Sequence, residues 1–248
     1  MKVTIIPKSK EFEDLLRLYP PVKAKDILPD WWKSLKPGSY KDSWKSQHLG
    51  MPTDNFVTAK KCPAIKDYFG EGIVLPLWGK LYISTEKYEG KDVTYAAFTP
   101  DAWHQEKLLG NHIHQQVGDM DIGMTADGKI LKIGMPYKIL VPEGYNIMYQ
   151  DPFYHFRNDI KALTGIVEAD KWGFVNFPIS IENSNCVVEA GTPFIYLHIY
   201  KKENIEMEYR EGTDEEYKLN DLEKGNLILN EHHNYKTEPK LYKDYPTY

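Results

Sequence analysis

Short apolar segments separated by turn residues dominate the second half of the chain. From residue 129 onward each segment is rich in Ile, Val, Tyr or Phe and is bounded by Gly, Pro, Asn or Asp. The segments are 129–134, 136–141, 145–150, 164–169, 173–181, 186–190 and 193–201. Many short strands of this kind are typical of β-sandwiches and barrels, because β-branched and aromatic side chains suit a pleated surface. The pattern predicts a mainly β protein.

The first half of the chain carries fewer strand patterns. Strands are expected at 2–6, 72–84 and 93–98, and Pro76 predicts a bend, an edge or a bulge in the second of these. A short N-terminal helix is expected around 26–35, where Pro29 and Asp30 suit a first turn, and residues 36–55 predict a long surface loop. Thr213 or Asp214 is expected to cap a C-terminal helix over 213–233.

These elements predict a single domain over residues 1–248. Its core strands fall mainly at 72–202, residues 1–70 form an N-terminal extension packed on that core, and residues 203–248 form a C-terminal helix and tail. A hydrophobic fraction of 42% and an aromatic fraction of 13% supply enough apolar surface for a core.

Charge and cysteine content narrow the class of protein. The net charge of −5 and pI of about 5.9 argue against nucleic acid as a partner, which needs a basic patch. No apolar run approaches the roughly 20 residues of a membrane span. Cys62 and Cys186 form no C-x-x-C pair, which indicates free thiols in a reducing compartment. The expected location is cytoplasmic or virion-associated.

Three turn motifs occur in order within residues 136–202: Pro142-Glu143-Gly144-Tyr145, then Gly165-Ile166-Val167-Glu168-Ala169-Asp170 with Gly173, and then Gly191-Thr192-Pro193 before an apolar strand. Together they resemble the β-clip core of the dUTPase and dCTP-deaminase families. The resemblance implies a β-clip-like (dUTPase-like) fold, with a related β-sandwich or barrel as the alternative. The same alignment implies that Glu168 stands where those families carry a catalytic Asp.

The departures from that family pattern concern phosphate binding. Asp151-Pro152-Phe153 stands where the resemblance implies a phosphate-gripping Arg-Ser, and Lys171 stands where it implies a Tyr on the deoxyribose. A triphosphate needs several cationic or N–H donors. The resemblance therefore implies a shape more than a dUTPase activity.

Over its whole length the chain is also similar to an uncharacterised family of tailed bacteriophages and marine bacteria. The similarity implies a source and no chemistry. The matching features are Pro29-Asp30-Trp31-Trp32, Lys61-Cys62-Pro63-Ala64, Gly72, Pro76-Leu77-Trp78, Pro142–Tyr145 and Gly191–Pro193.

Three histidines predict a divalent-metal site of the cupin type, whose cofactor would be iron or manganese. A His-x-His on a strand places His112 and His114 on one face, and His104 lies nearby in the sequence. The remaining ligands would come from Glu106 or Asp119, and from His155 or His198. Solvent-facing or hydrogen-bonded histidines are the default interpretation, and the metal site is the hypothesis set against it.

Two further groups are candidates for chemistry. If Glu168 and Asp170 end a strand they share a face, and one hypothesis is that their repulsion raises one pKa for base catalysis. The favoured interpretation is a solvated acidic turn, or an Asp170 that accepts hydrogen bonds from turn amides. Arg157, one of only three arginines, is expected to recognise an anion or to pair with Asp151 or Asp159.

The aromatic run 145–156 predicts a ligand pocket or a subunit interface. Its candidate binding residues are Tyr145, Tyr149, Phe153, Tyr154 and His155. The sequence therefore favours a non-catalytic binding or assembly module, with a homo-oligomer and a phage or host protein as expected partners. A nucleotide hydrolase that uses Glu168, and a metalloenzyme that uses His112 and His114, are the alternatives.

Overall fold

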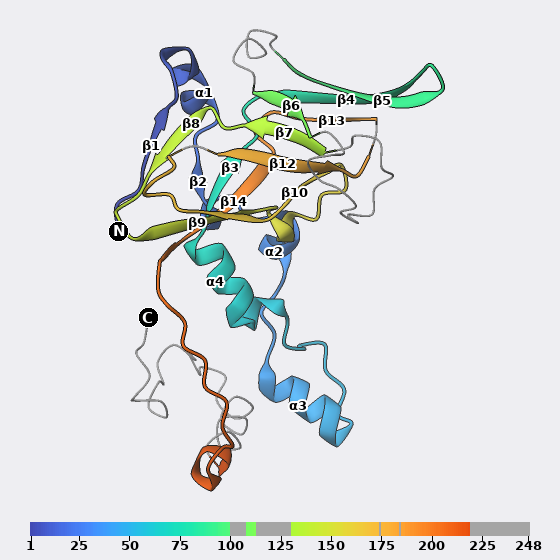
Figure 1. Ribbon diagram of the computed structural model, residues 1–248. Coiled ribbons are helices and arrows are strands. Elements are labelled where there is room, and N and C mark those ends of the chain that lie inside the picture. Colours follow the sequence, from blue (N-terminus) through green and yellow to red (C-terminus); the bar gives the residue numbers. More distant parts are fainter. Residues whose placement is uncertain (100–107, 113–129, 174, 184, 219–248) are drawn as a thin grey trace. The chain divides into compact units, whose positions relative to one another are not determined.

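A computed structural model describes residues 1–99, 108–112, 130–173, 175–183 and 185–218 (Figure 1). Strands outnumber helices throughout the second half of the chain, and every strand pair in the sheets is antiparallel. The prediction of a mainly β protein is confirmed. The chain divides into two compact units, 1–29 with 70–203 and 30–69 with 204–248. The single-domain organisation stays a prediction.

The first unit holds four antiparallel sheets (Figure 1). Most of their strands fall where the apolar segments predicted them, but the short strands at 22–23, 109–111 and 160–162 were not predicted. In one sheet β1 (Thr4–Pro7) pairs with β8 (Tyr137–Leu140). A second has the order β10 (Ile160–Ala162), β12 (Asn176–Ile181), β7 (Ile130–Gly134), β6 (Leu109–Asn111). A third has the order β11 (Gly165–Val167), β9 (Tyr145–Gln150), β14 (Pro193–Lys201), β3 (Ile73–Pro76), β2 (Val22–Lys23), and the fourth has the order β13 (Cys186–Val188), β4 (Lys80–Tyr88), β5 (Lys91–Thr99).

One hydrophobic core joins these sheets. In β8 the buried Tyr137 and Ile139 alternate with the exposed Lys138 and Leu140, which is the period of two that a half-buried strand requires. At the centre the fully buried Trp78 ring lies 5.5 Å from Phe194, 6.1 Å from Tyr137 and 6.3 Å from Phe98, measured between ring centroids. Rings from β14, β8 and β5 thus meet on one side chain, which ties separate sheets together.

Pro76 marks a bulge, as its position in an apolar run predicted. The pairing of β14 with β3 shifts register between Pro193 and Ile195, opposite Pro76. A proline cannot donate to a sheet ladder, so an irregularity at this position costs no hydrogen bond. Short helices also belong to this unit: η1 (Lys10–Phe12), α1 (Glu13–Leu18), η2 (Ala24–Asp26) and η5 (Phe153–His155).

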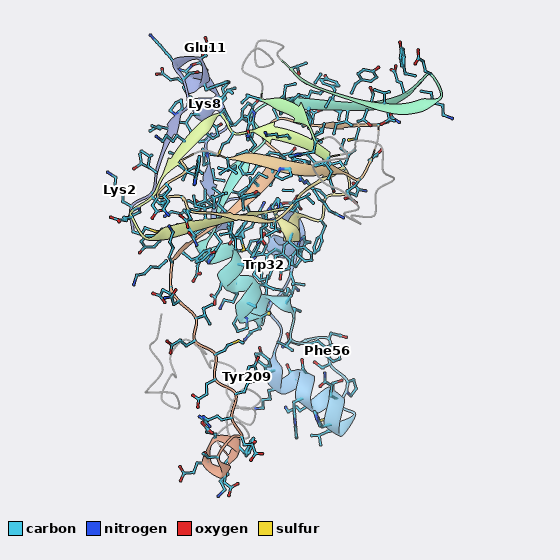
Figure 2. All side chains as sticks on the ribbon, in the orientation of Figure 1. Lys2, Lys8, Glu11, Trp32, Phe56 and Tyr209 are labelled. Atoms are coloured by element: carbon cyan, nitrogen blue, oxygen red, sulfur yellow. The ribbon has the colours of Figure 1, made fainter. Side chains whose placement is uncertain are left out.

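The described part of the second unit is helical. It contains α2 (Asp30–Ser34), α3 (Tyr40–Leu49), η3 (Ala59–Lys61), the greater part of α4 (Pro63–Glu71), and a helical turn at 214–218. Trp32, labelled in Figure 2, is buried against Phe69 with 5.0 Å between ring centroids, and Lys60 Nζ lies 4.7 Å from the centroid of its ring. The long loop expected over 36–55 is wrong, because α3 occupies its centre.

Two caps explain why α3 forms in a polar segment. The Ser39 hydroxyl accepts a hydrogen bond from Asp42 N at 3.2 Å, and Gly50 ends the helix in the left-handed conformation at φ 63°. A side-chain cap and a C-terminal glycine satisfy the hydrogen-bonding groups at the two ends of a helix, and neither requires an apolar periodicity in the sequence.

The predicted C-terminal helix is described only over 214–218, where Thr213 Oγ1 accepts a hydrogen bond from Glu216 N at 3.2 Å. No helix in the described ranges has both the length and the apolar character that a membrane crossing requires.

Candidate functional site

A hollow of about 460 Å³ opens on the outer face of the sheet that contains β7 and β12. Lys132 and Pro178 lie opposite each other across that strand pair, and Gly110 lies opposite Lys132 on the other side. The hollow, here called the Trp172 groove, is lined by His112, Lys132, Val167, Trp172, Val175, Asn176 and Pro178. Apolar lining with a few polar groups is the usual composition of a small-molecule site.

A tight turn after β11 presents Trp172 at the wall of the groove. The carbonyl of Glu168 accepts hydrogen bonds from Lys171 N at 3.0 Å and from Trp172 N at 2.9 Å. On the other side Gly173 O accepts from Ile139 N at 2.7 Å, and a Cβ at Gly173 would collide with the Lys138 side chain. The backbone is therefore fixed on both sides of Trp172, although 66% of the residue remains exposed.

The polar groups of the groove come from three elements. Lys132 is on β7, Asn176 starts β12, and His112 follows β6, where its amide donates to Ile130 O at 3.1 Å. No described acidic side chain forms an ion pair with Lys132. The groove thus combines one aromatic face, one amide, one imidazole and one cation that has no acidic partner in the part of the chain that the structure describes.

Glu168 and Asp170 lie in a lysine-rich network beside this turn. Lys202 Nζ lies 2.8 Å from Asp170 Oδ1 and 3.6 Å from Glu168 Oε2, and Lys171 Nζ forms a close ion pair with Glu168. The second oxygen of Asp170 accepts from Gly144 N at 2.9 Å. The carboxylates therefore tie together the turn after β11, the turn before β9 and the end of β14.

This network moves both carboxyl pKa values downward. The hydrogen bond from Lys171 is the main cause of the lowered pKa of Glu168, and the hydrogen bond from Lys202, followed by the one from Gly144 N, lowers the pKa of Asp170. The hypothesis that repulsion raises one of the two pKa values is wrong, because two ammonium groups outweigh one neighbouring carboxylate. The favoured interpretation, in which Asp170 accepts a hydrogen bond from a turn amide, is confirmed by the bond from Gly144 N.

Arg157 lies in a separate network, among the loops before β10. Its guanidinium donates to Asp151 Oδ1 at 2.9 Å, to Pro193 O at 2.9 Å and to Ile160 O at 3.1 Å, and its Nε lies 3.8 Å from Asp159 Oδ1. Only 7% of its side chain is exposed. Burial raises the pKa of Asp151, and Arg157 with the Ala162 amide opposes that rise. These contacts hold loops together and use both terminal nitrogens of the guanidinium, whereas the buried Nε has no hydrogen-bond partner among the described residues.

The aromatic run 145–156 divides between core and surface. Tyr149 packs on the core, with its ring centroid 5.2 Å from that of Phe177, and burial raises its pKa. Phe153 and Tyr154 belong instead to a surface cluster with Phe156, with ring centroids 5.3 to 6.3 Å apart. Tyr145 begins β9 opposite Lys201, and His155 ends η5. None of these residues lines the Trp172 groove.

The predicted metal ligands are only partly described. His112 lies at the groove, whereas His104, His114, Glu106 and Asp119 lie outside the described residues. Within the described ranges no three His, Cys, Asp or Glu side chains converge on a common point. The metal site therefore stays a prediction.

Trp172, Lys132 and Asn176 were not predicted as site residues. Lys132 and Asn176 lie in strands whose sequences predict only core elements, and nothing in the sequence shows that β7 and β12 are neighbours. An exposed tryptophan two residues beyond an acidic turn was the one local signal.

Comparisons with known proteins give a distant likeness in fold. Neither a scan against protein-family models nor a search of curated proteins found a match. Among solved structures, the chain is similar to the native dUTPase of EIAV, with TM-score 0.31 and 13% identity over 58% of this chain and 86% of that chain. It is also similar to a point mutant of the dUTPase from phage phi11 of S. aureus, which coordinates a structural Mg(II) ion; the TM-score is 0.26, with 12% identity over 43% of this chain and 98% of that one. So distant a likeness does not bear on function.

Proposed function

We propose that this chain is a non-catalytic binding module whose Trp172 groove holds an acidic saccharide. The observation that carries the proposal is the exposed indole of Trp172 beside a hollow that also contains Lys132. The negative face of an indole attracts the C–H groups of a sugar ring. The ammonium group of Lys132 suits a carboxylate on that ring, and the amide of Asn176 can donate to one hydroxyl while accepting from another.

The contacts of Glu168 and Arg157, the two strongest candidates for catalytic residues, are those of structural residues. Glu168 is paired with two lysines and its pKa is lowered, so it is a weak base for activating water. Arg157 is buried and already makes three hydrogen bonds. A nucleotide hydrolase would need both groups to be available to substrate. A metalloenzyme that uses His112 and His114 remains the second candidate, and elemental analysis of the purified protein tests it.

The proposed function as a binding module includes assembly of the chain into a homo-oligomer. A binding module gains avidity when several copies present their sites together, so a homo-oligomer suits this function. A cytoplasmic or virion-associated location, and a phage or host protein as a partner, fit such a module and are likewise part of the proposal.

Calorimetric titration tests the saccharide site directly. Wild-type protein is titrated with an oligogalacturonate and with a neutral oligosaccharide of the same length, and we expect the acidic ligand to bind more tightly. Trp172→Ala should weaken binding at least tenfold, which corresponds to about 1.4 kcal/mol. Tyr88→Ala is the matched control, because Tyr88 is an exposed aromatic residue on a different sheet.

Three outcomes would overturn the proposal. The first is that the wild-type protein binds no saccharide, and the second is that the control variant loses as much affinity as Trp172→Ala. The third is that the protein binds nucleoside triphosphates tightly and hydrolyses them in a reaction that Glu168→Gln abolishes.

A further inference from the structure

The segment between β14 and the helical turn at 214–218 has the pattern of a strand but no strand partner among the described residues. Residues 204–210 read Asn-Ile-Glu-Met-Glu-Tyr-Arg, a strict alternation of apolar and polar side chains. Such alternation over five or more residues is the signature of a strand with one buried face. In Figure 1 the segment is an extended coil without an arrow, drawn in orange.

The apolar side chains of this segment are almost fully exposed. Ile205 is 87% exposed, Met207 is 75% exposed and Tyr209, labelled in Figure 2, is 87% exposed. The Tyr209 hydroxyl lies 3.9 Å from Met207 Sδ, so these two side chains lie on the same side of the chain. A row of three large exposed apolar side chains is unusual on a protein surface and marks a contact with another surface.

The fourth sheet of the first unit offers the matching feature, an edge strand that has no outer strand partner among residues 1–99, 108–112, 130–173, 175–183 and 185–218. β5 is the last strand in the order β13-β4-β5, and it pairs with β4 over nine successive residues without a register shift. Natural edge strands are usually protected by being short or by a proline, a bulge or an inward charge. β5 is long, contains no proline and has no bulge, so its outer backbone N–H and C=O groups form a template for another strand.

Length singles out β5 among the described edges. Seven residues in a strand span about 23 Å, which needs an acceptor of at least seven residues. The edge strands β6, β10, β11 and β13 have three residues each, β2 has two, and β1 and β8 have four each. Of the described edges, β5 alone can pair with the whole of residues 204–210.

The outer face of the sheet that contains β5 is also apolar enough to continue the row formed by Ile205, Met207 and Tyr209. Phe98 is buried and Ala96 packs on the core, so Tyr95 and Ala97 face outward. Together with Tyr82 and Val187 they line a shallow hollow of about 520 Å³. A strand added beyond β5 with Met207 beside Tyr95 would continue this surface and leave Glu206 and Glu208 on the opposite side.

We propose that residues Asn204–Arg210 of one copy of this chain add as a strand to the β5 edge of a second copy. Reciprocal exchange satisfies both open edges and gives a closed dimer with two-fold symmetry. Main-chain hydrogen bonds would supply most of the affinity, and the alternating apolar row would set the register. The proposal does not depend on the saccharide site.

The first test measures oligomeric state by size-exclusion chromatography with light scattering. We expect the wild-type chain, of mass 28.9 kDa, to elute with at least twice that mass. Ile205→Asp/Met207→Asp should return it to a monomer with an unchanged circular dichroism spectrum, because both side chains are exposed within the single chain. Glu206→Gln/Glu208→Gln, on the other side of the segment, is the matched control and should keep the larger mass.

Disulfide trapping tests which edge is used. In a Cys62→Ser/Cys186→Ser background, one chain carries Tyr95→Cys and a second carries Ile205→Cys, Met207→Cys or Tyr209→Cys; the two chains are mixed and mildly oxidised. Cross-strand neighbours on one face have Cβ atoms about 5 Å apart, so at least one pairing should form a mixed dimer in high yield. Val187→Cys, equally exposed on the opposite edge, should give at least tenfold less.

A monomeric wild-type chain at every concentration would overturn the proposal. Equal trapping by Val187→Cys would overturn it as well, and so would a cross-link that forms only when both cysteines are in one chain.

Discussion

Lys202 and Asp170 join two distant parts of the chain, with 2.8 Å between Nζ and Oδ1. The backbone strengthens the link, because Lys202 N donates to Gly144 O at 2.7 Å while Gly144 N donates to Asp170 Oδ2 at 2.9 Å. Gly144, at φ 81°, has the left-handed conformation that this turn requires. One lysine therefore holds the end of β14, the turn before β9 and the turn that carries Trp172.

Replacing Lys202 with methionine should make the protein less stable at neutral pH. Lys202 lowers the pKa of Asp170 below its unfolded value, so its stabilising effect is present above that value and is lost as the pH falls through the folded pKa. In urea unfolding, the difference between Lys202→Met and wild type should be largest above about pH 5 and should shrink as the pH falls below the ordinary pKa of an aspartate, about 3.9. Lys201→Met, which removes only an exposed pair with Glu203, is the control. A difference independent of pH would show that the ion pair is not the cause.

Arg157→Met should destabilise the first unit by about 3 kcal/mol. It leaves the buried Asp151 carboxylate without its partner, and breaking one side of a buried pair costs more than removing both. The double variant Arg157→Met/Asp151→Leu should therefore recover part of the loss. Guanidinium unfolding at pH 7 measures both, and a double variant less stable than the single one would contradict this account.

Gly165→Ala should lower the free energy of unfolding by about 1–3 kcal/mol. Gly165 lies opposite Tyr149 in the pairing of β11 with β9, and an added Cβ would collide with the ring and hydroxyl of that tyrosine. Gly110→Ala is a matched control from another strand, because its Cβ would lie 3.8 Å from Lys132 Cβ in ordinary contact. Thermal unfolding should separate the two variants, and equal effects would mean that the collision is relieved at no cost.

Lys132→Gln should reduce the affinity for an acidic saccharide about tenfold and leave the affinity for a neutral one unchanged, because it removes one charge and keeps a polar side chain. The difference should shrink as salt is raised, since the groove is open to solvent. Calorimetry at low and high ionic strength checks both points. An equal loss for both ligands would assign Lys132 a role in groove shape.

Helices were harder to predict than strands. The strand pattern is local, since a period of two in residues such as Tyr137–Leu140 is visible without any partner. α3 has no apolar stripe of that kind and depends on the Ser39 cap and the Gly50 terminus, so its segment was expected to be a loop. The alternation at Ile205, Met207 and Tyr209 is equally local, yet its meaning depends on the open β5 edge.

The residues of the candidate site could not be predicted from local sequence patterns. The sequence alone determined most of the short strands between residues 130 and 201 and their turns at Gly and Pro, because side-chain alternation and turn chemistry act over a few residues. Tertiary structure decided that Lys132 and Asn176, far apart in the chain, line one groove with Trp172. It also decided that Glu168 and Asp170 pair with lysines, so that their pKa values fall. Strand register and the distances between charges fix these relationships, and neither is encoded in any single segment.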